Sequence, residues 1–123
     1  MSALSTAVPD PYAADCPTRS VLDRIGDRWT VLVLLLLSRR SHRFTEVSRA
    51  IAGISPKVLT QTLRALERDG LVTREVFAEV PPRVEYALTD LGHTLVEAVA
   101  ALAAWSREHF DEVLDARAAY DAR

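Results

Sequence analysis

FTEVSRAIAGISPKVLTQTLRALERDG, residues 44–70, has the pattern of two helices joined by a tight turn. The first helix is predicted over 45–52, because its opening threonine is a good N-cap and a glutamate follows in the first turn. Gly53 suits a sharp turn between helices, since glycine tolerates a positive φ. Ser55 then caps a second helix, which begins with proline and is expected over 56–69.

The second helix is predicted to have two different faces. Leu59, Leu63 and Leu66 recur at i, i+4 and i+7 and would form a buried stripe. The other stripe holds cations and hydrogen-bonding groups without an acid, namely Lys57, Thr60, Gln61, Arg64 and Arg68. This arrangement is typical of a helix-turn-helix whose second helix enters the DNA major groove. The alternative is an ordinary solvated helix face.

A β-hairpin is predicted directly after the second helix. Residues 71–76 alternate and are rich in β-branched side chains, and 84–88 would be the partner strand. A very short strand over 42–44 is expected to pair with this hairpin. A hairpin after a recognition helix is a wing, and its Arg83 and Arg74 are placed to reach phosphates or the minor groove. The alternative for Arg83 is a solvent-facing hairpin charge.

Basic charge is concentrated on this predicted DNA-binding region. The net charge of −2 is unfavourable for a polyanionic partner, but residues 39–83 hold nine Lys and Arg against five Asp and Glu. Residues 84–123 hold three against eight. Because the local field matters more than the total charge, the separation is compatible with a nucleic-acid contact.

Length and composition indicate one domain with a buried core, since 49% of the 123 residues are hydrophobic. The apolar run 31–37 is far shorter than the roughly 20 residues that span a membrane, so a core helix is expected and no membrane partner. A single cysteine, Cys16, excludes an internal disulfide and favours a cytoplasmic protein. No metal or other cofactor is expected, because the histidines are scattered and have no cysteine nearby.

The fold class expected is mainly α-helical with a small β-hairpin wing. Residues 1–14 are expected to form a flexible arm, 15–89 a winged helix-turn-helix domain and 90–123 a dimerisation helix. Within the domain, two further helices are predicted over 19–26 and 29–37, and the second should be central because it is almost wholly apolar.

The C-terminal helix is predicted to run for roughly 25 to 30 residues, or about 40 Å at the usual rise per residue. That length exceeds what a small domain can cover, so part of its apolar surface needs another partner. The simplest partner is a second copy, which would give a two-fold homodimer. The alternative is a helix that lies wholly against its own domain. The expected interface residues are Leu95, Val99, Leu102, Trp105 and Phe110.

Several motifs occur in order along the chain: CP (16–17), IGDRWT (25–30), RFTEV (43–47), GISPKVLTQ (53–61), LERDGLV (66–72) and VPPRVEYALT (80–89). With these motifs the chain resembles the HxlR-type winged-helix transcription regulators, relatives of the MarR group. The resemblance covers about residues 15–107. It implies a homodimeric DNA-binding regulator with its recognition helix over 55–69, a wing around Arg83, and dimerisation through the N-terminal and long C-terminal helices.

Cys16 is open to two interpretations. In some similar regulators a cysteine at this place senses oxidants or electrophiles, which predicts an oxidant or small-molecule effector; a helix N-terminus would lower the pKa of its thiol. With one cysteine per chain, a disulfide would join two subunits or capture a small thiol. The alternative, which the sequence favours, is a reduced side chain packed in the dimer interface. A thiol-dependent enzyme is disfavoured, because no base or resolving thiol occurs nearby.

The sequence therefore predicts a homodimer that binds a pseudo-palindromic operator, and not an enzyme. Gln61 and Arg64 are expected at base edges, because glutamine pairs with adenine and arginine with guanine. The other candidates would position the DNA backbone or flank it: Ser55, Lys57, Thr60 and Arg68, then Arg43 and Arg83. The rival is a winged-helix protein-interaction module, which would need an apolar patch where these polar residues occur.

Overall fold

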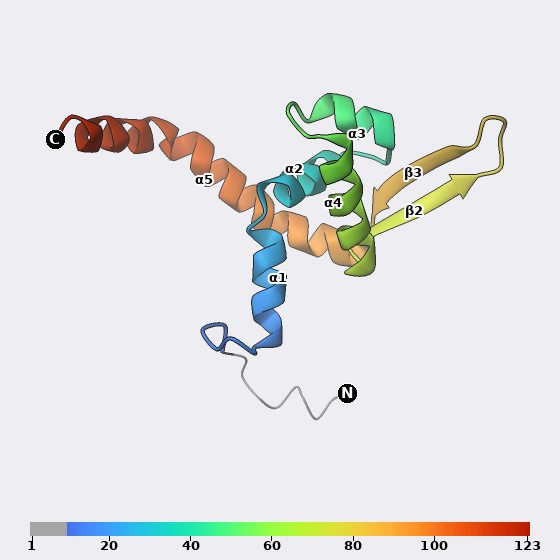
Figure 1. The fold of residues 1–123 in the computed structure, drawn as a ribbon, viewed down its shortest axis with the longest axis horizontal. Coiled ribbons are helices and arrows are strands. Elements are labelled where there is room, and N and C mark those ends of the chain that lie inside the picture. The colour runs from blue at the N-terminus through green and yellow to red at the C-terminus, as the bar shows by residue number, and fades with distance from the viewer. Residues whose placement is uncertain (1–9) are drawn as a thin grey trace.

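The computed structural model describes residues 10–123, so residues 1–9 of the expected arm lie outside the described part. Within it the chain forms five helices and a three-stranded antiparallel sheet (Figure 1). The elements are α1 (Pro17–Ile25), α2 (Arg28–Leu37), β1 (His42–Arg43), α3 (Phe44–Ala50), α4 (Pro56–Arg68), β2 (Val72–Phe77), β3 (Arg83–Leu88) and α5 (Asp90–Asp121). The expectation of a mainly helical protein with a small hairpin wing is confirmed.

Helix α4 carries strong local signals at both ends, as its sequence predicts. The Ser55 hydroxyl oxygen accepts a hydrogen bond from the Val58 N–H at 3.1 Å, and Pro56 takes the first helical position. Gly53 before the helix and Gly70 after it have φ values of 88° and 76°. Both turns therefore use the left-handed conformation that glycine adopts most readily.

The start of α3 differs from the prediction. The helix begins at Phe44, one residue early, and the hydroxyl of Thr45 does not cap it. Instead Glu46 Oε1 accepts a hydrogen bond from the Arg43 N–H at 2.8 Å. This bond holds the pKa of the Glu46 carboxyl below its ordinary value, and it fastens the end of β1 to the first turn of α3.

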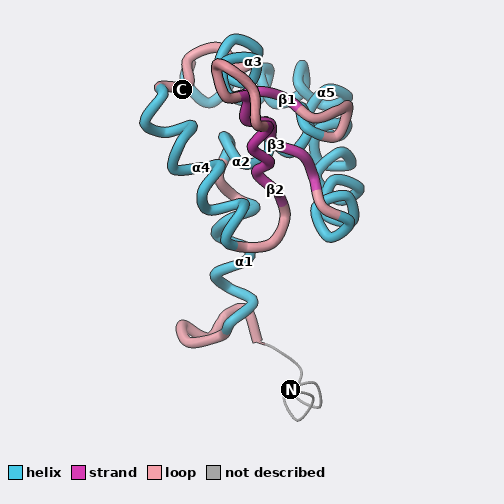
Figure 2. The backbone as a smooth tube through the Cα atoms, turned by 90° about the vertical axis from the view of Figure 1, so that its right-hand side faces the viewer, coloured by secondary structure: helices cyan, strands magenta, loops and turns pink. Residues whose placement is uncertain are grey.

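The sheet has the strand order β1-β3-β2, and the short strand expected before α3 does pair with the wing, with His42 opposite Tyr86. Strand β2 contacts α4 and β3 contacts α5, so the base of the sheet lies between these helices (Figure 2). Farther out, β2 and β3 extend away from the helices as a two-stranded wing (Figure 1).

The core forms around α2, as its apolar sequence predicts. Val33, Leu34 and Leu37 of α2 are buried. They belong to one cluster with the predicted leucine stripe of α4, with Val47 of α3 and with Val72 of β2. Together these side chains fix the orientation of α4 and leave its opposite face in solvent.

Helix α5 is 32 residues long, about 48 Å at the standard rise. Its first turns pack on the domain, while its C-terminal half extends away from the rest of the chain (Figure 1). Val99 is fully buried in the core of its own chain, so its prediction as a dimer-interface residue is wrong. The large hydrophobic side chains that α5 leaves exposed are Leu91, Leu102, Trp105, Phe110, Leu114 and Tyr120. None of the described helices has the length and apolarity needed to cross a membrane.

Candidate nucleic-acid interface

The solvent face of α4 carries most of the predicted DNA-contacting side chains. Its exposed members are Lys57, Gln61, Arg64 and Arg68, with Ser55 at the cap and Thr60 half-buried. Between residues 10 and 123, none of the four exposed side chains forms an internal hydrogen bond or ion pair. The face therefore offers cationic and amide groups that are free to bind an external polyanion.

A cleft of about 440 Å³ separates this face from the wing. Thr60, Arg64 and Glu67 line it from α4, Arg74 and Tyr86 line it from β2 and β3, and Phe44 lines it from α3. Arg74 and Tyr86 are register partners across the hairpin. Sequence reasoning placed Arg74 on the wing but did not predict that it would share a cleft with Arg64, because that depends on how the hairpin packs.

Arg83, the predicted wing contact, is surrounded by its own chain. Its Nη2 lies 3.1 Å from Glu79 Oε2, and its Nε lies 3.3 Å from Glu85 Oε2, where the angle does not allow a hydrogen bond. The guanidinium also stacks over the Phe77 ring, 4.1 Å from its centroid. The guanidinium of Arg83 therefore interacts with two carboxylates and an aromatic ring of its own chain. The sequence did contain a signal for this, since Arg83 and Glu85 are two residues apart on one strand face.

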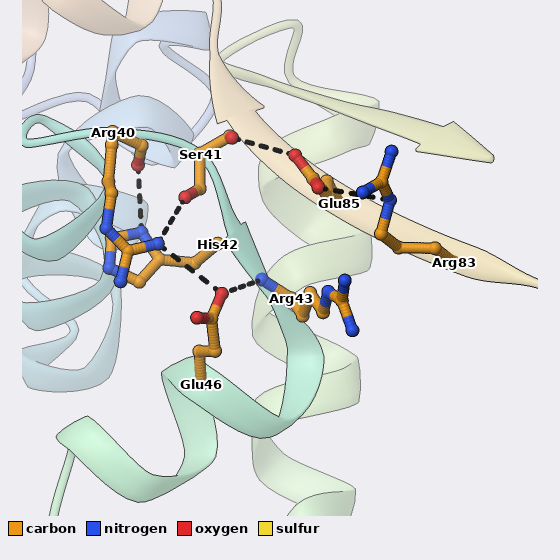
Figure 3. A network of polar contacts seen from close by, with 7 residues as sticks. All are labelled: Arg40, Ser41, His42, Arg43, Glu46, Arg83 and Glu85. Atoms are coloured by element: carbon orange, nitrogen blue, oxygen red, sulfur yellow. Dashed lines mark hydrogen bonds and ion pairs between the residues drawn. The ribbon is translucent and has the colours of Figure 1, made fainter. Parts of the chain in front are cut away.

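A polar network ties the wing to the segment before α3 (Figure 3). Glu85 accepts a hydrogen bond from the Ser41 hydroxyl at 2.9 Å, in addition to its ion pair with Arg83. On the other side of β1, Glu46 pairs with Arg40 at 3.4 Å and accepts the Arg43 N–H. The Arg43 side chain is exposed at the edge of this network. These contacts connect β3 of the wing to the segment that leads into α3.

Cys16 lies immediately before α1 and is half-buried. Its Sγ is 3.0 Å from Thr18 Oγ1, and this contact lowers the pKa of the thiol from its ordinary value. At the other end of α1, Arg24 Nε forms an ion pair of 2.9 Å with Asp69, the residue that follows α4. Helix α1 therefore links the cysteine to the end of α4. In the described residues no group of three His, Cys, Asp or Glu is placed to hold a metal ion.

The model of one protein family, described as HxlR-like helix-turn-helix, matches residues 24–113. The chain belongs to this family. The match includes the glycine turn, α4, the wing and most of α5, so the elements that form the cleft are those of the family. The resemblance seen in the sequence is confirmed.

Named relatives agree with this assignment. An uncharacterized HTH-type transcriptional regulator, YtfH of Escherichia coli (strain K12), is 48% identical over 106 residues, which are 86% of this chain and 84% of the relative. The solved structure of the putative transcriptional regulator ytfH from Salmonella typhimurium has a TM-score of 0.84 and 43% identity, covering 89% of this chain and 98% of the other. The reduced form of the redox regulator HypR has a TM-score of 0.75 and 37% identity, covering 80% and 98%.

Proposed function

We propose that the protein is a sequence-specific DNA-binding transcription regulator that acts as a homodimer on a pseudo-palindromic operator. The observation that carries this proposal is the solvent face of α4, whose exposed cations and amide have no partner among the described residues. Such a face fits the major groove, where arginine, lysine and glutamine recognise base edges and phosphates. Relatives of the chain are named as HTH-type transcriptional regulators, which supports the same function. Action on operator DNA would place the protein in the cytoplasm.

Gln61 is our first candidate for reading a base, because it is exposed in the middle of the free face and its amide can pair bidentately with adenine. Ser55, Lys57, Thr60 and Arg68 would position the DNA backbone around it, and Arg43 would flank the site. The rival function, a protein-interaction module, has little support, since this face carries no apolar patch.

The homodimer would form through α5 and α1. Leu102, Trp105 and Phe110 are each more than half exposed on the part of α5 that leaves the domain. Val21 and Leu22 of α1 are similarly exposed. Covering these side chains with a second copy would remove a large apolar surface from water. Binding to a pseudo-palindromic operator would require this dimer to present its two α4 helices about 34 Å apart, one turn of DNA.

Footprinting on the DNA that flanks the protein's own gene tests the proposal directly. The expected result is protection of a two-fold symmetric sequence with half-sites one helical turn apart. Sedimentation of the free protein should give the mass of a dimer. Protection without symmetry, or a monomer at micromolar concentration, would contradict the proposed assembly.

Regulation through Cys16 is a second component of the proposal. The lowered pKa of the thiol favours the thiolate, which is the form that oxidants attack. Helix α1 and the Arg24–Asp69 ion pair connect this thiol to the end of the recognition helix. Oxidation should therefore change operator affinity in the native protein and leave the affinity of Cys16→Ser unchanged. Equal responses of the two proteins would contradict it.

A further inference from the structure

The cleft between α4 and the wing has an unusual balance of charge. Arg64 and Arg74 face it from opposite walls, and neither forms an ion pair within the described residues. Glu67 is the one carboxylate in its lining. Within the described residues its carboxylate forms no ion pair with the guanidinium group of either arginine. The hydroxyl-bearing Thr60 and Tyr86 complete the polar lining. Two arginines without an ion pair outweigh the single carboxylate, so the cleft has a net positive charge and neutral donors that suit an anion.

The position of the cleft indicates which anion it would take. Thr60 and Arg64 are one turn apart on α4, and Arg74 and Tyr86 are paired across β2 and β3. When a recognition helix lies in the major groove and a wing lies over the adjoining minor groove, one sugar-phosphate strand separates the two grooves. That strand has to pass between the helix and the wing, which is where this cleft lies.

Arg83 does not take part in this site, although it is the wing arginine that the sequence suggests. A phosphate at its guanidinium would have to displace Glu79 and Glu85, and both carboxylates would repel it. The side chain stays packed on Phe77. Arg83 therefore acts on the conformation of the wing, whereas Arg74 is the wing arginine that faces the recognition helix.

We infer that this cleft binds one phosphodiester of the operator backbone, with Arg64 and Arg74 as its cationic ligands. The inference rests on the proposed function and makes it more specific. It also changes the role expected for Arg64, from reading a guanine to holding the backbone. Glu67 lies in the same cleft, and its negative charge opposes binding of a phosphate. A single substitution of Glu67 can remove this charge.

Four variants test the inference by fluorescence anisotropy on the footprinted operator over a range of KCl concentrations. Arg74→Ala and Arg64→Ala should each raise Kd about tenfold, by the same factor on operators with single base-pair changes. Because both arginines bind the same phosphate and the dimer holds one such phosphate per subunit, each substitution should reduce the slope of log K against log salt by at most about 2. Arg83→Ala is the matched control, with an unchanged slope. Glu67→Gln should bind more tightly than the native protein.

A neutral methylphosphonate placed at single backbone positions identifies the bound phosphate. At one position per half-site the methylphosphonate should weaken binding of the native protein. The same substitution should have no further effect on Arg74→Ala, since that variant has already lost the contact between Arg74 and the phosphate. Thermal melting by circular dichroism checks that each variant is folded. Three results would overturn the inference. The salt slope of Arg74→Ala could equal that of the native protein, or Arg64→Ala could lose affinity only through one particular base pair. The losses of affinity caused by the methylphosphonate and by Arg74→Ala could also be additive. Native protein without salt-dependent DNA binding would overturn the proposed function as well.

Discussion

Helix α4 and the wing both carry arginines, and their surroundings differ. On α4, Arg64 and Arg68 project into solvent without a carboxylate partner among the described residues. On the wing, Arg83 is held by two glutamates and a phenylalanine. From residue type and position in the sequence alone, all three arginines would be predicted to contact DNA. The comparison teaches that the charge available to a polyanion is set by the acids that the fold brings to each arginine.

The largest effect we expect concerns how α4 is held. Leu63→Ala should lower the free energy of unfolding by about 2–5 kcal/mol, because the side chain is buried among leucines of α2 and α4. Arg64→Ala, at the next residue, whose side chain is exposed, should change stability by less than about 0.5 kcal/mol. Urea unfolding monitored by tryptophan fluorescence measures both. Equal losses would mean that the two faces of α4 are not distinct.

Replacing Gln61 tests whether the free face reads sequence. Gln61→Ala should cost about 1–3 kcal/mol on the native operator and much less on an operator changed at the base pair that Gln61 contacts. A panel of single base-pair substitutions measured by anisotropy identifies that pair. A uniform loss across the panel would instead assign Gln61 to the DNA backbone.

The wing side of the comparison can be tested by its stability. Arg83→Ala should destabilise the fold by about 1 kcal/mol, through loss of two partly exposed ion pairs and the stacking on Phe77. Hydrogen exchange should accelerate at β2 and β3 and stay unchanged in α4. Unchanged exchange in the wing would show that its conformation does not depend on Arg83.

The sequence predicted the parts of this comparison that are locally determined. Ser55, Pro56 and the flanking glycines define α4, and the leucine spacing identifies its buried face. Periodicity could not tell whether Val99 packs on its own chain or on a partner, since both produce the same stripe. Nor could it place Arg74 and Arg64 in one cleft, because the cleft lies between two elements whose relative position depends on the packed core.

A smaller effect is expected at the junction of β1 and α3. The hydrogen bond from the Arg43 N–H is the chief cause of the lowered pKa of Glu46. The charged carboxylate therefore stabilises the folded state fully at pH values above 4.5, the ordinary pKa of the group. That contribution is lost as the pH falls through the lowered pKa. The melting temperature of Glu46→Gln should therefore be lower than that of the native protein at pH 7, and the two melting temperatures should become equal in acid. A difference independent of pH would point to packing as its cause.

The salt dependence of operator binding by the native protein tests the central claim most directly. If the unpaired cations of α4 and the cleft contact roughly 6 to 10 phosphates, log K should fall linearly with log salt with a slope of about −5 to −9. A slope near zero would show that these side chains do not meet a polyanion, and it would contradict the account.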